Sequence, residues 1–533
     1  MKKTRSWRFE FSIEKDVLLL IMVISVALLL RIWGLSYDLP YVYHPDEPGL
    51  ITIIQNIFKT GDLNPRFFHY PSLFFYINAV SYIPYYLFGK FLGYFKNKTD
   101  ILAPISLVMG TTWAPMPGVV LLGRWVTVMF GVGTVGLAYW LGKQLGGRSL
   151  VGVLAAGLLA VSPTNVMHSR YVTPDTLVTF WAVATLLAAV RVYQRGGLRH
   201  YLMAGVAIGL TASSKYNGAL IASALLVAHF MRYGKAGFRE PKLYLALFMS
   251  ALTFLATTPF AILDFPRFIA DLKFDAFHYS TGHAGMEGDS FRWYLNYMWK
   301  TAGIVYIISF VAIIYGILYR SKYIILISSF PVIYFGFISN FQVRNDRTFL
   351  PITPFLFVIF ALFCDIMIEF TKNLKGDIER FILRLIMAGM LIGAVFQPVW
   401  KTIADTSRLL IVDSRETARV WIDQNLPPGS RIAIESYSPF IDPQKFYIQG
   451  FGSMIEHDPE WYVENNFNYL VFSEGMYGRF YLNPARYRDQ ILKYERFFRN
   501  FDMVMLFNDG DYEIRIYRIG SPKQGSQNED KNR

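Results

Sequence analysis

Two adjacent carboxylates stand in the stretch His44-Pro-Asp-Glu-Pro48, shortly after the first long apolar run of the chain. Asp46 suits the cap of a helix that begins near Pro48, and Glu47 suits the first turn of that helix. A carboxylate fixed at a helix start beside a membrane surface could also serve as a general base. The helix dipole would favour its anion and keep its pKa low. The two interpretations are compatible, and both stay open.

A second acidic position, Asp175, follows Pro174 at the start of another apolar run. Thr173 could cap this helix, and Asp175 would then be an ordinary acid of the first helical turn. The order of the apolar runs places Asp175 on the same side of a membrane as Asp46. In one helix bundle the two acidic positions could therefore converge.

Four cations fall on that side as well: Arg124, Lys215, Arg344 and Arg347. Arg124 lies inside an apolar run, where a charge costs about 2.5–3.5 kcal/mol on insertion scales and usually faces a cavity or a partner. Snorkelling of Arg124 and simple solvation of the others are the alternatives. As a group these side chains suit a phosphate, for which arginine is a bidentate partner and lysine a point charge.

The sequence argues against several other kinds of site. Four histidines of the same side (His44, His69, His278 and His283) could hold a divalent metal together with carboxylates, but no H-x-x-x-H or H-E-x-x-H spacing is present. No phosphate-binding GxxxxGK[ST] loop occurs, nor a GxGxxG after a strand, which argues against a nucleotide hydrolase or a dinucleotide enzyme. The single cysteine, Cys364, can form neither an internal disulfide nor a cysteine-based metal site.

The composition is that of a membrane protein. Of the 533 residues 53% are hydrophobic and only 17% charged, and the mean hydropathy is +0.30, which argues against a soluble enzyme and against a disordered chain. A net charge of +13 would suggest nucleic acid in a soluble protein. Here cytoplasmic loops that collect Lys and Arg explain it, and no nucleic-acid partner is expected.

A spanning helix needs about 20 mostly apolar residues. The run 71–95 contains Pro84 and Lys90, and we interpret it as a helix that lies at the membrane interface; a re-entrant or true span is the alternative. The other runs predict eleven spans, at residues 17–35, 119–142, 149–167, 174–192, 201–214, 217–231, 242–262, 301–319, 322–339, 348–370 and 381–399.

The loop charges predict the orientation. With a cytoplasmic N-terminus (1–16), every inner connection is short and carries Lys and Arg, as the positive-inside bias demands. The outer segments are then 36–118, 263–300, 340–347 and the tail after 401. The expected organisation is mostly α, with a transmembrane module at 17–400, a small extracytoplasmic α/β domain at 401–520 and a disordered end at 521–533.

The tail has alternating helix-like and strand-like patterns. Helical spacing covers Ser414–Asn425 and Pro484–Asn500. Strands are predicted at Arg431–Glu435, Tyr469–Phe472, Met503–Phe507 and Glu513–Ile519.

Several stretches resemble, in order, the polytopic glycosyltransferases of the C superfamily, a group that includes protein O-mannosyltransferases, aminoarabinose transferases and lipopolysaccharide-core galacturonosyltransferases. The resemblance covers about residues 15–360 and rests on the order of the motifs together with the topology. Thr348 stands where the family usually has Tyr. The matching stretches are His44-Pro-Asp-Glu47, Phe68-His-Tyr-Pro-Ser-Leu-Phe-Phe-Tyr76, Gly123-Arg-Trp-Val-Thr127, Thr173-Pro-Asp-Thr176, Gly209-Leu-Thr-Ala-Ser-Ser-Lys-Tyr216 and Arg347-Thr-Phe-Leu-Pro-Ile-Thr-Pro354.

The resemblance implies an integral-membrane enzyme that passes a sugar from a polyprenyl-phosphate donor to an acceptor outside the cytoplasm (a lipid, a glycan or a protein), with inversion at the anomeric carbon. Asp46 would deprotonate the acceptor hydroxyl, and Glu47 or Asp175 would orient the acceptor, the sugar or a cation. The phosphate would meet Arg124, Lys215 and Arg347, and further substrate contacts are expected from His44, His69 and Tyr70. The scheme requires no cofactor, and a divalent metal ion stays possible.

Two alternatives were weighed. A polytopic transporter or lipid flippase should show paired repeats or broken helices near the membrane midplane. No repeat is visible, and the polar residues gather on one side, which favours chemistry at that side. An oligosaccharide transferase of the same superfamily carries a Trp-Trp-Asp sequence in its soluble domain, and the tail contains none.

Overall fold

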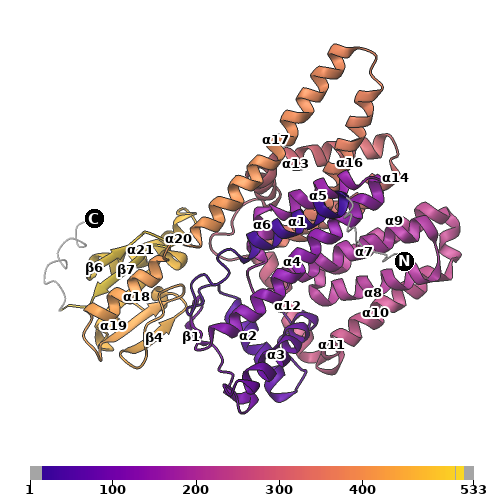
Figure 1. Cartoon of the computed structure of the whole chain (residues 1–533). Coiled ribbons are helices and arrows are strands. Elements are labelled where there is room, and N and C mark those ends of the chain that lie inside the picture. The colour runs from indigo at the N-terminus through magenta and orange to yellow at the C-terminus, as the bar shows by residue number, and fades with distance from the viewer. Residues whose placement is uncertain (1–14, 511, 521–533) are drawn as a thin grey trace, which may run out of the picture.

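The computed structural model describes residues 15–510 and 512–520, which form a large helical module and a smaller sheet domain at its side (Figure 1). The predicted cytoplasmic N-terminus (1–16) lies almost wholly, and the predicted disordered end (521–533) wholly, outside the described residues. The helices of the module are α1 (Lys15–Ile32), α2 (Glu47–Thr60), α3 (Leu73–Phe91), α4 (Pro117–Gly146), α5 (Ser149–Ala160), α6 (Pro163–His168), α7 (Asp175–Arg195), α8 (Leu198–Ser214), α9 (Ala222–Tyr233), α10 (Pro241–Thr257), α11 (Phe260–Leu263), α12 (Phe265–Thr281), α13 (Ser290–Leu318), α14 (Lys322–Ile338), α15 (Asp346–Phe349), α16 (Thr353–Lys372) and α17 (Asp377–Arg408).

Five helical segments of the described chain are long and apolar enough to cross a membrane. They are α4, α7, α13, the combined segment Asp346–Lys372 that ends in α16, and α17. Three shorter apolar helices, α5, α10 and α14, accompany them. The mostly helical, polytopic character predicted from the hydropathy is thus present.

Each of the eleven predicted spans contains a helix, but four of them are interrupted. In 242–262 helix α10 ends at Thr257 and α11 begins at Phe260, and 348–370 passes through α15 and a 3-10 turn before α16. The run 149–167 breaks after Ala160, and α6 restarts with Pro163 as its first residue. Proline has no N–H to donate and is tolerated at a first helical position, so it starts a helix more readily than it continues one. The run 217–231 begins as a 3-10 helix, Tyr216–Ile221, before α9. At 12 residues each, α5 and α9 reach about 18 Å, short of the hydrocarbon thickness of about 30 Å.

Close packing of α8 between α7 and α10 fixes the centre of the module. A Cβ at Gly205 would stand 2.3 Å from the carbonyl oxygen of Ala246, and one at Gly209 would stand 2.6 Å from that of Ser250. Small residues let two helix backbones approach this closely inside a membrane. The three helices therefore hold their ends in fixed positions, and those ends carry Asp175 and Lys215.

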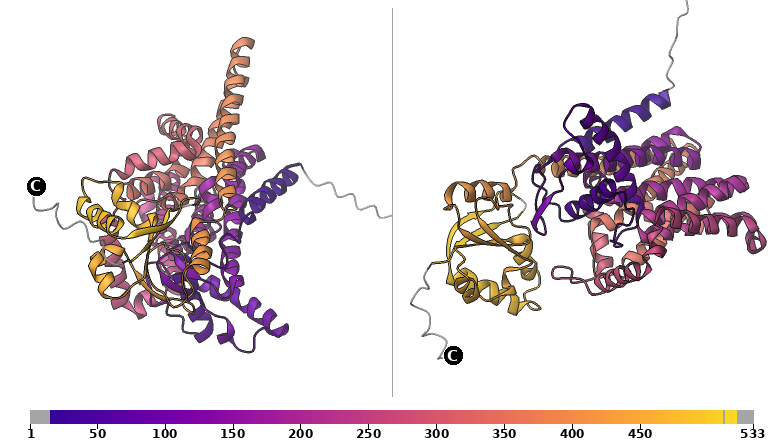
Figure 2. Two further views of the ribbon diagram at one scale, coloured as in Figure 1. Left: turned by 90° about the vertical axis from the view of Figure 1, so that its left-hand side faces the viewer. Right: turned by 90° about the horizontal axis from the view of Figure 1, so that it is seen from below.

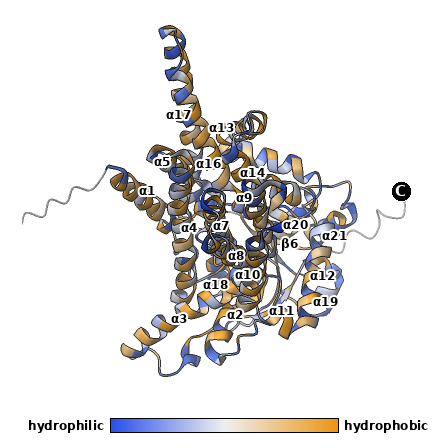
Figure 3. Ribbon diagram, turned by 90° about the vertical axis from the view of Figure 1, so that its right-hand side faces the viewer, coloured by the Kyte–Doolittle hydropathy of each residue, from blue (hydrophilic) through white to orange (hydrophobic). Residues whose placement is uncertain are grey.

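Apolar residues follow the outer sides of α1, α3 and α17 (Figure 3). On α17 they include Phe381 and Phe396, which are 67% and 65% exposed. Only 17% of the most apolar stretch of α17 is buried inside the protein, against 50–83% for the other four long segments. A surface of this kind suits contact with the hydrocarbon of a membrane.

The sheet domain has three layers. Its five-stranded mixed sheet has the order β4-β3-β5-β7-β6, with β3 parallel to β4 and β5, and β7 antiparallel to β5 and β6. Helix α18 packs on one face, and α19, α20 and α21 pack on the other. The elements are α18 (Ser414–Asn425), β3 (Arg431–Glu435), β4 (Tyr447–Phe451), α19 (Pro459–Glu464), β5 (Tyr469–Ser473), α20 (Glu474–Tyr481), α21 (Arg488–Asn500), β6 (Asp502–Phe507) and β7 (Ile514–Arg518).

The predicted α/β pattern of this domain is confirmed. The helix predicted at Pro484–Asn500 is α21, which begins at Arg488, whereas α19 and α20 were not predicted. The helix predicted at Ser414–Asn425 is α18, and the four predicted strands are β3, β5, β6 and β7. The edge strand β4 escaped prediction because its sequence, Tyr-Ile-Gln-Gly-Phe, has a polar residue and a glycine where a buried strand would be apolar. Helix α17 continues past residue 400, and α18 begins only at Ser414.

A hairpin of the segment 36–118 joins the sheet domain to the module (Figure 2). It consists of β1 (Ile105–Val108) and β2 (Thr111–Trp113), neither of which was predicted. Tyr437 donates its N–H to the carbonyl of Met109 over 2.8 Å, and the Thr111 hydroxyl donates to the carbonyl of Ser438 over 2.6 Å.

Two arginine side chains that stack on tyrosine rings complete this contact. Arg415 of α18 lies 4.1 Å from the ring centre of Tyr43, and Arg419 lies 4.7 Å from that of Tyr41. The backbone between them donates to the hairpin, from Val42 N–H to the Thr112 carbonyl over 2.8 Å. The sheet domain therefore holds the chain that leads directly into Asp46.

Candidate active site

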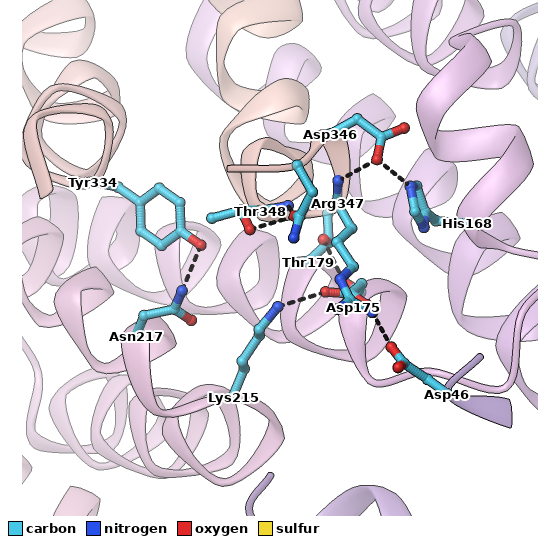
Figure 4. A network of polar contacts seen from close by, with 11 residues as sticks. Asp46, His168, Asp175, Thr179, Lys215, Asn217, Tyr334, Asp346, Arg347 and Thr348 are labelled. Carbon is cyan, nitrogen blue, oxygen red and sulfur yellow. Dashed lines mark hydrogen bonds and ion pairs between the residues drawn. The ribbon is translucent and has the colours of Figure 1, made fainter. Parts of the chain in front are cut away.

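Asp46 forms an ion pair with Arg347, which comes from the beginning of the segment Asp346–Lys372 (Figure 4). Asp46 stands at the N-cap of α2, but its side chain makes no capping hydrogen bond, because it turns to the guanidinium instead. Burial alone would raise the pKa of Asp46, yet the charges of Arg347 and His44 hold that pKa below its ordinary value. Both side chains stay partly exposed, at 29% and 24%, so the pair is open to a ligand.

Asp175, the first residue of α7, lies deeper and pairs with Lys215. The Lys215 ammonium donates to Asp175 Oδ1 over 2.8 Å, and the carboxylate is fully buried. Its other oxygen, Oδ2, accepts no hydrogen bond within the described part of the chain. A buried acceptor left open costs about 1–3 kcal/mol, so this oxygen is ready to accept a donor group.

A third pair, Asp346 and His168, adjoins the first. His168 Nε2 lies 3.1 Å from Asp346 Oδ1, which also accepts the N–H of Arg347 over 2.8 Å (Figure 4). Asp346 is 46% exposed, whereas His168 is nearly buried. Because Asp346 and Arg347 are consecutive, this pair sets the position of the Arg347 backbone beside Asp46.

Glu47 was expected to contact substrate and Arg124 to contact the phosphate, but the structure pairs the two side chains with each other. They form a bidentate pair with no exposed surface, in which Arg124 Nε and Nη2 donate to Glu47 Oε1 and Oε2 over 3.0 and 2.9 Å. Glu47 also accepts the Val172 N–H over 2.9 Å, and burial, which would raise its pKa, is outweighed by the Arg124 charge, which lowers it. Arg124 Nη1 donates to the carbonyls of Leu35 and Tyr37, so it presents no free face to a phosphate. The pair instead joins α2, α4 and the loop before α7.

Replacing Arg124 with methionine is expected to lower the free energy of unfolding by about 3–5 kcal/mol, because the Glu47 charge would stay buried without a partner. The measurement is thermal unfolding of the detergent-solubilised protein. The matched control is Arg66→Met, which removes an arginine that is 68% exposed and pairs with Asp62 at the surface, where ion pairs contribute about 0–1 kcal/mol. Equal stabilities for the two variants would contradict a structural role for Arg124.

The three predicted substrate-contact residues have different surroundings. His44 accepts the Asp46 N–H at Nδ1 over 3.3 Å and packs on Tyr171, and burial lowers its pKa. The hydroxyl of Tyr70 is in the field of Asp46, Asp175 and Arg347, and burial raises its pKa. His69 turns away to Asp275 of α12, with Nδ1 and Oδ1 2.7 Å apart, and this bond raises the pKa of His69. His44 and Tyr70 therefore adjoin the site, and His69 joins the segment before α3 to α12.

The described residues contain no cluster of side chains that could form a metal site. Among residues 15–510 and 512–520, no group of three or more His, Cys, Asp or Glu side chains is placed to hold a metal ion. His278 and His283 stack on one another with ring centres 5.8 Å apart.

The fold matches that of several solved proteins. ArnT from Cupriavidus metallidurans, in its apo state, superposes with a TM-score of 0.54 over 94% of this chain and 98% of its own, at 14% sequence identity. The archaeal oligosaccharyltransferase AglB from Archaeoglobus fulgidus, in complex with an inhibitory peptide and a dolichol-phosphate, gives a TM-score of 0.54 over 87% of this chain and 70% of its own, also at 14% identity. The chain thus has an ArnT-like fold and is an integral membrane protein.

Sequence comparison points to a particular family. Residues 106–272 match the family described as dolichyl-phosphate-mannose-protein mannosyltransferase. The dolichyl-phosphate-mannose–protein mannosyltransferase 1 of Candida albicans is 33% identical over 100 residues, which are 18% of this chain and 11% of that protein. The predicted resemblance to polytopic glycosyltransferases of the C superfamily is confirmed by these matches together with the fold.

Proposed function

We propose that this protein transfers a sugar from a polyprenyl-phosphate donor to an acceptor outside the cytoplasm, with inversion. The observation that carries the proposal is the meeting of two carboxylate–cation pairs, Asp46 with Arg347 and Asp175 with Lys215, from four separate segments of the chain. The family match and the ArnT-like fold support it.

Arg347 is the phosphate ligand in this scheme. In the structure its guanidinium is occupied by Asp46, so a donor phosphate competes for it and frees the Asp46 carboxylate. Asp46 then takes the proton of the acceptor hydroxyl, whose oxygen forms a bond to the anomeric carbon of the sugar. The bond from that carbon to the phosphate oxygen breaks, and polyprenyl phosphate leaves with the electron pair. Arg347 stabilises the charge that grows on the leaving phosphate.

Asp175 and Lys215 serve the sugar and the phosphate. The open oxygen of Asp175, Oδ2, is the acceptor for a hydroxyl of the donor sugar, and Lys215 supplies a second positive charge 2.8 Å from the other oxygen. A phosphate leaving group needs little proton donation, so the scheme contains no general acid. We assign Glu47 and Arg124 to positioning, because both are buried and bonded to each other.

The lipid of the donor is a polyprenyl chain. ArnT from Cupriavidus metallidurans was solved bound to undecaprenyl phosphate, with a TM-score of 0.51 to this chain, and AglB was solved with a dolichol-phosphate. Both ligands combine a long hydrocarbon chain with a phosphate. A site at the edge of an apolar bundle, with its cations at the mouth, suits that combination.

The proposal is tested by asking which sugar donor the protein uses. Purified protein in lipid nanodiscs is expected to move a radiolabelled sugar from polyprenyl phosphate to an acceptor in an envelope extract, and to leave the same sugar on a nucleotide diphosphate untouched. Transfer from the nucleotide sugar alone would refute the proposal. Movement of the lipid-linked sugar across proteoliposomes without transfer would support a flippase instead.

The proposed topology has eleven spans, a cytoplasmic N-terminus at 1–16, a transmembrane module at 17–400 and an outer domain at 401–520, with α3 at the membrane interface. The active site and the sheet domain then face the outside. The basic inner connections support this orientation.

A pair of single cysteines tests the orientation. In a Cys364→Ala background, Thr281→Cys at the end of α12 is expected to react with a membrane-impermeant maleimide in intact cells, and Lys375→Cys between α16 and α17 to react only after lysis. Both positions are exposed. The reverse labelling pattern would invert the topology and place the proposed site in the cytoplasm.

A further inference from the structure

A cavity of about 500 Å³ lies beside the active site and plays no part in the scheme above. Its walls come from α6, from the first turns of α13, from the segment before α15, and from α17. It is thus bounded by four parts of the chain that are far apart in the sequence, and Asp346 stands in its wall.

One wall of the cavity is an aromatic surface made by two stacked side chains. Trp293 and Tyr297 are one helical turn apart on α13, and their rings stack with centres 5.7 Å apart and planes inclined by 2°. Both side chains are partly exposed. Aromatic walls with a few polar groups are typical of small-molecule sites, and the apolar face of a sugar ring packs well on such a surface.

The charged side chains of the cavity are three cations and two acids. The cations are Lys300, Arg344 and Lys401, and the acids are Asp346 and Asp405. Lys401 pairs with Asp405 over 3.1 Å, and Arg344 Nη1 donates to the carbonyl of Gly288 over 2.9 Å. Within the described residues Lys300 forms no ion pair. Lys300 therefore offers an uncommitted positive charge beside the aromatic surface.

The cavity and the active site are neighbours that do not coincide. Asp346 lines the cavity, and the next residue, Arg347, extends its side chain away toward Asp175 and Asp46 (Figure 4). Neither Arg347 nor Lys215 lines the cavity. A second substrate could therefore occupy the cavity while the donor phosphate is held by Arg347.

We propose that this cavity binds the headgroup of the acceptor, and that the headgroup is a sugar carrying an acidic group. The ring would pack on Trp293 and Tyr297, and Lys300 would meet the anion. This inference rests on the proposed function and deepens it, because it assigns the acceptor to the class of anionic glycans or glycolipids.

A binding experiment tests the site without turnover. Saturation-transfer NMR on the detergent-solubilised protein would use glucose 1-phosphate as the probe and methyl glucoside as its uncharged counterpart. Glucose 1-phosphate is expected to bind, and Lys300→Gln is expected to weaken that binding about tenfold, the loss of roughly 1.4 kcal/mol. Trp293→Leu should remove the saturation of the sugar-ring protons. The matched control is Lys96→Gln, an exposed lysine of the first outer segment.

Arg347→Ala separates this inference from the proposed function. Retained binding of glucose 1-phosphate in Arg347→Ala, with loss in Lys300→Gln, supports the cavity. Loss in Arg347→Ala and not in Lys300→Gln would place the probe at the donor site and overturn the inference while leaving the proposed function intact. Absence of binding to the unaltered protein would also overturn it.

Turnover gives an independent check. With an envelope extract as acceptor, Lys300→Gln is expected to raise the amount of extract needed for half-maximal rate and to leave the KM for the lipid-linked donor unchanged. A change in the donor KM alone would assign Lys300 to the donor and overturn the inference.

Discussion

Asp46→Asn is expected to abolish sugar transfer, with a loss of about 10²- to 10⁴-fold in kcat. The amide has nearly the shape of the carboxylate but cannot take a proton from the acceptor hydroxyl. The charge of Arg347 holds the pKa of Asp46 below its ordinary value, so the carboxylate is already ionised at neutral pH. Freed from Arg347 by the donor phosphate, it becomes a stronger base at the moment it is needed.

The measurement is single-turnover transfer in nanodiscs, with membrane insertion and thermal unfolding followed in parallel. The control is Asp62→Asn, which alters a surface carboxylate of the same outer segment that pairs with Arg66. Full turnover by Asp46→Asn would remove Asp46 as the base. Loss of insertion together with activity would assign it a structural role, as we expect for Glu47→Gln.

Arg347→Ala should reduce kcat/KM for the lipid-linked donor by roughly 10- to 150-fold, the equivalent of about 1.5–3 kcal/mol for a charge-assisted hydrogen bond. Because Arg347 meets charge that grows on the leaving phosphate, the loss should appear in kcat as well as in KM. Its removal also raises the pKa of Asp46 from this lowered position, because burial then acts without the opposing charge of Arg347.

The comparison is with Arg347→Lys and Arg292→Ala. Lysine keeps the positive charge but cannot form the two parallel hydrogen bonds of a guanidinium group, so an intermediate rate is expected. Arg292 is an exposed cation at the start of α13, and its removal should leave the rate unchanged. A donor KM and kcat unaltered in Arg347→Ala would refute the role of Arg347 in phosphate binding.

Hydropathy located the helices well, because membrane insertion depends on the apolar content of a segment. It could not predict where a helix breaks and restarts inside one apolar run, as happens between Ala160 and Pro163. Nor could it predict the hairpin β1–β2, whose strands are only four and three residues long and whose partner is the sheet domain. Contacts of that kind depend on chain segments that are more than 300 residues apart, as Thr111 and Ser438 are.

The site was predictable in part, because charged residues near the ends of apolar runs are visible in the sequence. Asp46, Asp175, Lys215 and Arg347 were recognisable as charges near the ends of apolar runs, and the structure brings them together. The bidentate pairing of Glu47 with Arg124, 77 positions away, was not visible, since either residue alone fits a substrate role.

Two neighbours of the site were missed. Asp346 precedes Arg347, and His168 opens the stretch that leads to Asp175, yet neither shows its partner in the sequence. The one signal in the sequence was that Asp346 is an acid directly beside Arg347, a predicted phosphate ligand.

Arg415 stacked on Tyr43 has a practical consequence for anyone who trims this protein. Cutting the chain after α17 would remove Arg415 from Tyr43, which lies three positions before Asp46, the proposed general base. Such a truncated protein should be purifiable and still inactive. Its lack of activity would therefore not show whether the removed domain touches a substrate. Grafting the domain of a relative should restore turnover only if the graft brings an arginine to the same ring.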